Sequence, residues 1–144
     1  EKKIIDGWLH TGDYATLDEQ GYFYFKGRKD DLINSSGYRI GPSEIENTIL
    51  SIDEVEMAAV VGVPDDLRGQ IIKAVIVPRN KTYIDSQNPE LKDKIKNKVK
   101  NKLAAHEYPR IIEFVNELPL TTTGKIKRNI IREKHLRKIN ERKI

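Results

Sequence analysis

Three short apolar runs dominate the hydrophobic pattern of this sequence. Residues 55–63 are almost entirely apolar and rich in valine, and residues 71–77 repeat the pattern before Pro78. A third run, 111–115, follows Pro109. Apolar runs of this length that are rich in β-branched residues favour buried strands over helices. The pattern therefore predicts three strands in the interior of a folded domain.

The apolar spacing becomes helical after residue 88. Asn88, Pro89 and Glu90 combine a capping side chain, a first-turn proline and an early acid, which together indicate a helix start. Beyond them an apolar residue recurs at every fourth position: Leu91, Ile95, Val99 and Leu103. Lysines alternate with other residues between 92 and 102, as in a strand, but the apolar spacing decides for a helix with one apolar stripe.

A second helix is predicted over about 43–51, and a third from about residue 128 onward. Pro42 suits a first-turn position, and Ser43 with Glu46 three residues later predicts a reciprocal capping box. The side chains expected on the apolar side of this helix are Ile45, Ile49 and Leu50.

The N-terminal part of the pattern predicts a β-hairpin. Residues 14–17 form its first strand, residues 18–21 its turn, and the aromatic residues 22–25 its second strand. Residues 34–39 and 79–88 are polar and are predicted as loops. The fold class that follows is α+β, with a small three-stranded sheet flanked by about three helices and preceded by the hairpin.

Length and composition are those of one globular domain. With 144 residues, of which 38% are apolar and 33% charged, the chain can form a proper core. No run of 18 apolar residues predicts a membrane span. The absence of cysteine excludes disulfides, thiolate metal ligands and a cysteine nucleophile. We expect a cytoplasmic location, or the mitochondrial matrix if the source is a eukaryote.

The net charge of +4 is unevenly distributed. Residues 125–144 contain nine Lys or Arg against two Glu, a local charge of +7, so the remainder carries −3. Such a basic segment could bind nucleic acid or anionic lipid, or it could be a solvated helix in an enzyme that handles phosphates. Neither nucleic-acid binding nor a membrane span is expected. The histidines, His10, His106 and His135, are too scattered to suggest a metal site, and no metal ligand set is predicted.

Three motifs follow one another at suitable separations. They are GWLHTGD at 7–13, YFKGRKDDLINSSGYRIGPSEIE at 24–46 and TTTGKIKR at 121–128. Together they resemble the adenylate-forming superfamily, which comprises acyl-CoA synthetases, the adenylation domains of peptide synthetases, and luciferases. The middle motif is most similar to the medium-chain acyl-CoA synthetase branch. The resemblance covers essentially the whole chain.

The resemblance implies the C-terminal domain, with its hinge, of an AMP-forming acyl-CoA synthetase. Residues 1–30 would be the trailing β-hairpin of a larger N-terminal domain together with the hinge, and residues 31–144 the mobile C-terminal domain. The chain starts with Glu1 and not with Met, and we expect a fragment that is inactive alone. The whole enzyme would use ATP with Mg²⁺ to convert a medium-chain or similar carboxylic acid to acyl-AMP, and then CoA to form the thioester.

Adenylation in this family depends on a lysine, which here corresponds to Lys125. An ammonium between a carboxylate and an α-phosphate stabilises the negative charge that builds as pyrophosphate leaves. This is not a P-loop lysine, because Pro119 and Ile126 break that motif. The resemblance assigns Asp13 and Arg28 to the sugar of ATP or AMP, and a carboxylate can accept two adjacent ribose hydroxyls.

The hinge position of the family corresponds to Asp30, with Asp31 as the rival assignment. A hinge residue must change its backbone dihedral angles without loss of packing. After the domain has swung, Arg39 would lie near the reacting acyl group. The residues that the resemblance assigns to CoA are Ser36, Gly37, Tyr38, Arg68, Lys100, Tyr108, Pro109 and Arg110.

Two departures from the family pattern and two alternative functions stay open. Glu107 stands where a lysine is common, and its carboxylate would repel CoA phosphates. Leu120 replaces a frequent basic residue. One alternative is an adenylation domain that delivers to a carrier-protein thiol, and the other is a basic module that binds nucleic acid or lipid.

Overall fold

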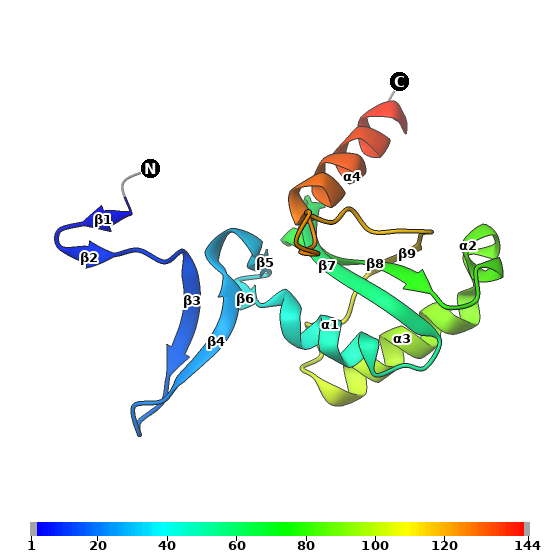
Figure 1. Ribbon diagram of the computed structural model, residues 1–144. Coiled ribbons are helices and arrows are strands. Elements are labelled where there is room, and N and C mark those ends of the chain that lie inside the picture. The colour runs from blue at the N-terminus through cyan, green and yellow to red at the C-terminus, as the bar shows by residue number, and fades with distance from the viewer. Residues whose placement is uncertain (1–2, 143–144) are drawn as a thin grey trace.

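The computed structural model describes residues 3–142, and its largest element is a five-stranded sheet with helices on both faces (Figure 1). Its two longest strands, β7 (Val55–Asp65) and β8 (Gly69–Pro78), pair with each other in antiparallel orientation. Strand β9 (Ile111–Phe114) runs parallel to β8. The three predicted strands and the α+β class are therefore confirmed.

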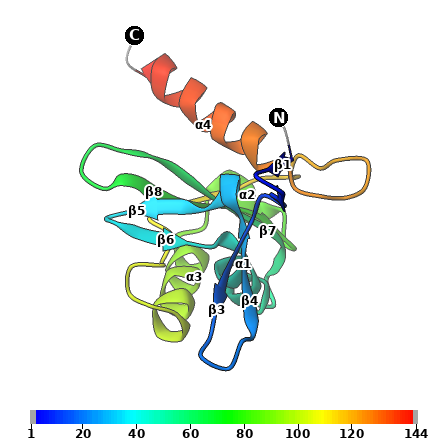
Figure 2. The ribbon, with the colours of Figure 1, turned by 90° about the vertical axis from the view of Figure 1, so that its left-hand side faces the viewer.

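The central strands are apolar on both faces because both faces are covered. Alternate side chains of a strand point to opposite sides, so a strand between two layers of helix has no polar face. On one side lie α1 (Pro42–Leu50) and α3 (Pro89–Lys102), and on the other lies α4 (Arg128–Arg142) (Figures 1 and 2). The two interior clusters are centred on Val60, Ile72, Ala74 and Ile76, and on Val61, Val63, Val75 and Val77.

The start of α1 differs from the predicted capping box. Gly41 is the N-cap residue, no side chain bonds to the cap, and Pro42 is the first helical residue. The carboxylate of Glu46 instead accepts a hydrogen bond of 2.9 Å from the amide of Val60 in β7. Ile45 and Ile49 are buried as predicted, whereas Leu50 is 44% exposed. The predicted capping box does not form, because the carboxylate of Glu46 bonds instead to a buried strand amide that water cannot reach.

The polar stretch 34–39 was predicted as a loop, and this prediction was wrong. It belongs to a hairpin of β5 (Ile33–Ser35) and β6 (Tyr38–Ile40), and β5 also pairs with the end of β8. The connection is two residues, Ser36 and Gly37, both with positive φ, at 51° and 85°. A two-residue hairpin turn of type I′ requires this left-handed backbone at both positions, and glycine adopts it without cost.

The region before α3 is also more regular than predicted. A short helix, α2 (Thr82–Ser86), occupies the middle of the stretch that was expected to be a loop. The cap at Asn88 is confirmed, because its side chain accepts a hydrogen bond of 2.8 Å from the amide of Leu91. The predicted apolar stripe faces the sheet, with Leu91, Ile95 and Val99 buried.

The N-terminal segment forms the predicted hairpin, β3 (Asp13–Leu17) and β4 (Phe23–Arg28), preceded by β1 (Ile4–Ile5) and β2 (Trp8–Leu9). In Figure 1 it stands to one side of residues 31–142, which we call the lobe. Its aromatic side chains are largely exposed, at 53–77% for those of residues 22–25. No helix within residues 3–142 is long and apolar enough to cross a membrane.

The hairpin meets the lobe at the start of α1. A Cβ added to Gly41 would lie 2.1 Å from the carbonyl oxygen of Lys26 in β4, so only glycine fits this approach. Side chains contribute less there, since the ion pair between Lys26 and Glu44 is exposed. The close backbone packing, and not the ion pair, holds the hairpin against the helix.

Gly41→Ala should therefore displace the hairpin while the lobe keeps its fold. We expect faster amide hydrogen exchange in β3 and β4 and unchanged protection in β7 and β8, because the added methyl group collides with backbone. Glu44→Gln, which removes only the exposed ion pair, is the matched control and should leave exchange in the hairpin unaltered. Equal exchange in Gly41→Ala and the native chain would contradict the packing argument.

An ionic cluster lies beneath α4, on the second face of the sheet. Lys73 is only 4% exposed, and its Nζ lies 2.7 Å from Oε2 of Glu113 and 3.3 Å from Nδ1 of His135. Lys138 of α4 also bonds to Glu113. Partial burial alone would raise the pKa of Glu113, but the hydrogen bonds and charges of Lys138 and Lys73 outweigh it and lower the pKa to about 2.

The depressed pKa gives this carboxylate a defined effect on stability. A group whose pKa falls on folding stabilises the protein above its unfolded pKa, and that contribution disappears as the pH falls from about 4.5 to about 2. Glu113→Gln should therefore lower the free energy of unfolding at pH 7 by about 1–3 kcal/mol, because buried Lys73 loses its counter-charge. It should also lose less stability than the native chain between pH 4.5 and 2.

Urea unfolding at pH 7 and pH 3 measures both effects. Glu117→Gln is the control, since Glu117 lies nearby but is exposed and makes no ion pair within residues 3–142. If Glu113→Gln and Glu117→Gln behaved alike at pH 7, the cluster would not stabilise α4 on the sheet.

Candidate functional site

Lys125 projects from a loop whose backbone is held by its own hydrogen bonds. Residues 119–127, which we call the lysine loop, close through a bridge between Leu120 and Ile126. The amide of Thr121 donates to the carbonyl of Lys125 at 2.7 Å, and the amide of Lys125 donates to Oγ1 of Thr121 at 2.9 Å. Gly124 has φ of 84°, which permits the tight turn. The loop therefore offers Lys125 from a fixed base.

The side chain of Lys125 is available to a ligand. It is exposed, and it forms no hydrogen bond or ion pair with any residue between 3 and 142. Many other cations in the described chain are committed to carboxylates, as Lys73, Lys138 and Arg128 are. A free ammonium on a rigid loop can stabilise negative charge that is brought to it by another domain or ligand.

Asp13 and Arg28 face each other across the hairpin. They are paired residues of β3 and β4, and Nη1 of Arg28 lies 3.0 Å from Oδ1 of Asp13 and 3.0 Å from the carbonyl oxygen of Thr11. Their side chains are 40% and 56% exposed, so both can still reach a ligand. The arginine fixes the carboxylate, and an oriented carboxylate can accept hydrogen bonds from two neighbouring hydroxyls.

The two candidate hinge residues have different surroundings. Asp30 lies in the middle of the short helix η1 (Lys29–Asp31), is exposed, and makes no side-chain bond within residues 3–142. On its N-terminal side the amide of Lys29 donates to the carbonyl of Gly12 at 2.8 Å. Asp31, by contrast, contacts two arginines of α4. A change of backbone angles at Asp30 therefore breaks no bond of its own side chain.

The residues expected at CoA fall into two neighbouring groups. In the first, the amide of Ser36 donates to the carbonyl of Arg68 at 3.0 Å, which places the Ser36–Gly37 turn beside the β7–β8 loop. Tyr38 stacks on His106 with ring centroids 3.9 Å apart. His106 was not predicted at this site, since a single histidine in a polar turn carries no sequence signal.

The second group surrounds Tyr108. The ammonium of Lys100 lies 4.3 Å from the centre of the Tyr108 ring, and the guanidinium of Arg110 lies 5.0 Å from it. Pro109, between the two, is buried. The carboxylate of Glu107 accepts a hydrogen bond of 2.9 Å from the amide of Ala104, so it caps its own turn. Two cations around one aromatic ring can bind a phosphate or a stacked base.

Arg39 lies apart from both groups. Its guanidinium is 5.9 Å from the centre of the Tyr14 ring, so it spans from β6 to the hairpin. It is exposed and has no ion pair within residues 3–142.

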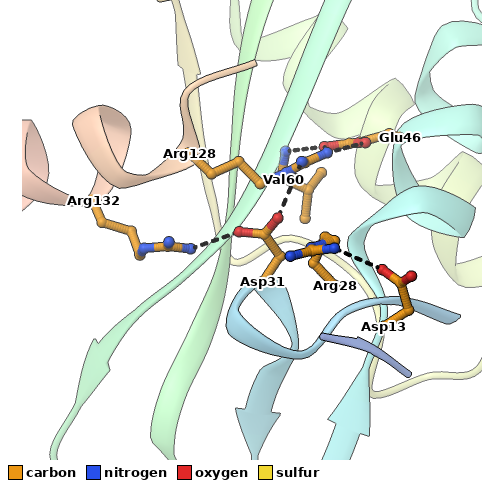
Figure 3. Close-up of polar contacts among 7 residues, drawn as sticks. All are labelled: Asp13, Arg28, Asp31, Glu46, Val60, Arg128 and Arg132. Atoms are coloured by element: carbon orange, nitrogen blue, oxygen red, sulfur yellow. Dashed lines mark hydrogen bonds and ion pairs between the residues drawn. The ribbon is translucent and has the colours of Figure 1, made fainter. Parts of the chain in front are cut away.

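A buried polar cluster was missed by the sequence analysis. Glu46 of α1 pairs with Arg128 at the start of α4, and Asp31 contacts both Arg128 and Arg132 (Figure 3). Arg128 ends the third motif, yet it was given no role. Its partner Glu46 is 82 residues away in the sequence, and no sequence pattern predicts such a pair.

Comparison with known proteins identifies what this chain resembles. Residues 44–125 match the family model described as AMP-binding enzyme C-terminal domain. Over 138 residues the chain is 50% identical to 4-hydroxybutyrate--CoA ligase 1 of Metallosphaera sedula, covering 93% of this chain and 24% of that protein. It is 46% identical to acyl-coenzyme A synthetase ACSM1, mitochondrial, of Mus musculus, over 88% of this chain and 22% of that protein.

A solved structure agrees in fold. The crystal structure of the ATP-bound RpMatB-BxBclM chimera B1 superposes with a TM-score of 0.80 at 33% sequence identity, over 92% of this chain and 26% of that one. The chain thus spans about a quarter of the length of the proteins it matches.

Proposed function

The chain belongs to the AMP-binding enzyme C-terminal domain family, and from that premise we propose that it is the mobile C-terminal part of an ATP-dependent carboxylic acid–CoA ligase. The named relatives are a CoA ligase and an acyl-coenzyme A synthetase, which supports this reaction class. In the first half-reaction a carboxylate oxygen attacks the α-phosphorus of ATP, and the bond to pyrophosphate breaks. In the second, the CoA thiol attacks the acyl carbon of acyl-AMP, and AMP leaves.

The single observation that carries this proposal is the free ammonium of Lys125 on the lysine loop. Charge on the α-phosphate and on the attacking carboxylate is greatest when pyrophosphate departs, and a fixed cation stabilises that state more than the ground state. The closed backbone of the loop supports this role, because it fixes the point from which the lysine side chain extends. Asp13, held by Arg28, is assigned to the hydroxyls of the nucleotide sugar.

We assign residues 1–30 to the edge of an N-terminal domain that lies outside this chain, with Asp30 as the hinge, and residues 31–144 to the moving domain. The exposed aromatic residues of the hairpin support this boundary, since so much exposed apolar surface suits burial against another domain. The acid, most of the ATP site and any magnesium that accompanies ATP would be held by that domain. The chain alone should catalyse neither half-reaction.

The second half-reaction would use the other side of the lobe. We assign Ser36, Gly37 and Tyr38 to the passage for the thiol arm, because the turn at Gly37 leaves backbone open to a ligand. Arg39 is assigned to the acyl group. The CoA nucleotide is assigned to Arg68, Lys100, Tyr108 and Arg110, whose cations suit phosphates. Buried Pro109 then supports the Tyr108 segment and makes no direct contact.

The acid is proposed to be a medium-chain or similar carboxylic acid. This rests on the sequence resemblance, and the name of the Metallosphaera sedula relative makes 4-hydroxybutyrate a second acid to test. The mouse relative is named mitochondrial, and by that likeness we propose the matrix or the cytoplasm as the location.

In the full-length enzyme, Lys125→Ala should lower acid-dependent pyrophosphate exchange by at least about 100-fold, because one preorganised donor to the transition state is lost. Conversion of preformed acyl-AMP and free CoA to the thioester should be nearly unchanged. Lys127→Ala, which removes another exposed lysine two residues away, is the control and should retain both half-reactions. Similar losses in the two half-reactions of Lys125→Ala would refute its assignment.

Asp30→Pro should give the opposite result. Proline fixes φ at residue 30 and disfavours the helical conformation of Lys29 before it, so the swing between the two half-reactions is hindered. We expect thioester formation from acyl-AMP to fall sharply while pyrophosphate exchange persists. Asp30→Ala removes the same carboxylate without fixing the backbone, and it should behave like the native enzyme. Normal thioester formation by Asp30→Pro would move the hinge elsewhere.

A further inference from the structure

Four charged side chains from three separate segments meet in the lobe (Figure 3). Nη2 of Arg128 lies 2.8 Å from each carboxylate oxygen of Glu46. Nη1 of Arg128 and Nη1 of Arg132 each lie 3.5 Å from Asp31. We call these four residues the arginine–carboxylate cluster. Two guanidinium groups face two carboxylates, so the charges balance.

The cluster is largely withdrawn from water. Glu46 is 8% exposed as a residue, and the side chains of Arg128 and Asp31 are 18% and 19% exposed. Oε1 of Glu46 also accepts a hydrogen bond from the amide of Val60, so both carboxylate oxygens have partners. Hydrogen bonds between charged groups are stronger when they are shielded from solvent, and removal of one partner leaves a buried charge uncompensated.

The bonds within the cluster differ in strength. The contacts between Arg128 and Glu46 are short, whereas those from Asp31 are long for hydrogen bonds. The Nε of Arg128 is buried without a partner within the described residues, so its terminal nitrogens alone hold the guanidinium. The short bonds between Arg128 and Glu46 thus hold the start of α4 against α1. Asp31 is joined to α4 by the longer contacts.

The positions of these residues in the chain connect two parts of the proposed machinery. Arg128 directly follows the lysine loop, whose last amide, Lys127, donates to the carbonyl of Pro119 at 2.8 Å. Asp31 directly follows the proposed hinge residue, Asp30. The same buried carboxylate, Glu46, therefore fixes the base of the lysine loop and, through Arg128, the first residue beyond the hinge.

The side-chain contacts that cross from the hairpin to the lobe are much weaker. The ion pair between Lys26 and Glu44 is exposed, with side-chain exposures of 37% and 56%. Arg39 reaches Tyr14 only over 5.9 Å. Rotation at Asp30 would break these contacts and leave the arginine–carboxylate cluster intact.

We propose that the arginine–carboxylate cluster makes the residue beyond the hinge and the lysine loop move as one rigid body, with Arg128 as the positioning residue for Lys125. The expected effect on adenylation rests on the proposed function, whereas the joint movement of the two segments does not. Arg128 touches no reacting atom, since both of its engaged nitrogens are committed to Glu46 and Asp31. Its effect on adenylation is to hold Lys125 within reach of the α-phosphate.

Kinetics of the full-length enzyme test the catalytic part. We expect Arg128→Met to lower kcat for acid-dependent pyrophosphate exchange by about 100-fold, with KM for ATP and for the acid changed less than about threefold. Thioester formation from preformed acyl-AMP should change little. Arg128→Lys keeps the positive charge but lacks the paired N–H donors of the guanidinium, so it should retain part of the activity that Arg128→Met loses. Arg137→Met, the same replacement at an exposed position of α4, is the control and should be fully active.

Hydrogen exchange of the same full-length protein tests the mechanical part without any substrate. In Arg128→Met the amides of Thr121, Gly124 and Lys125 should exchange faster, while β7 and β8 keep their protection. Asp31→Asn retains the bonds between Arg128 and Glu46 and should loosen η1 without loosening the lysine loop. If Arg128→Met does not fold, both the kinetics and the hydrogen exchange are measured on Arg128→Lys.

The outcomes separate the two proposals. Unchanged exchange in the lysine loop of the Arg128 variants would overturn the cluster inference, whatever the activity. Equal losses in both half-reactions would also overturn it, because the effect would then be general destabilisation. Faster exchange in the loop, together with a native enzyme that exchanges no pyrophosphate with any acid, would support the cluster and refute the proposed function instead.

Discussion

The carboxylate of Glu46 is the constraint on which the arrangement of this lobe depends. A carboxylate that is shielded from water must have its charge and acceptor sites satisfied, and Glu46 obtains a backbone donor from β7 and a guanidinium from α4. Helix α4 buries little apolar surface, because Ile131 is the one buried residue among its described side chains. Ion pairs to Glu46, Asp31 and Glu113 therefore supplement the apolar contact that holds this helix on the sheet.

The distribution of strong and weak contacts determines which parts can move together. Within the lobe, the sheet is covered on both faces, and its helices are joined by apolar and buried ionic contacts. Between hairpin and lobe, by contrast, the backbone of Gly41 packs closely on that of Lys26, and the ion pair between Lys26 and Glu44 is exposed. The guanidinium of Arg39 lies at a distance over the ring of Tyr14. This division of contacts is the one that the proposed hinge motion at Asp30 requires.

The division also explains why the residues assigned to chemistry lie where they do. Lys125, Arg39 and Asp30 are exposed, and within residues 3–142 none of them forms an ion pair, so each remains available to another domain or a ligand. Lys125 extends from a closed loop, and Arg28 orients the carboxylate of Asp13. Free reactive groups on fixed bases suit catalysis by positioning, because little order must be gained during the reaction.

Much of the fold could be predicted from the sequence, since local patterns determine it. Apolar runs gave the three central strands, four-residue spacing gave α3, and Asn88 fixed the start of that helix. The motifs singled out Lys125 and Asp30, and both residues are exposed. What the pattern could not reveal was long-range: Glu46 bonds to Val60 and Arg128 instead of its own helix end, and residues 33–40 pair as strands beside β8. The sequence by itself determined which segments form helices and strands, because those preferences depend on neighbours in the chain. Only the tertiary structure decided which charges meet, because burial of a carboxylate selects its partners by proximity in space.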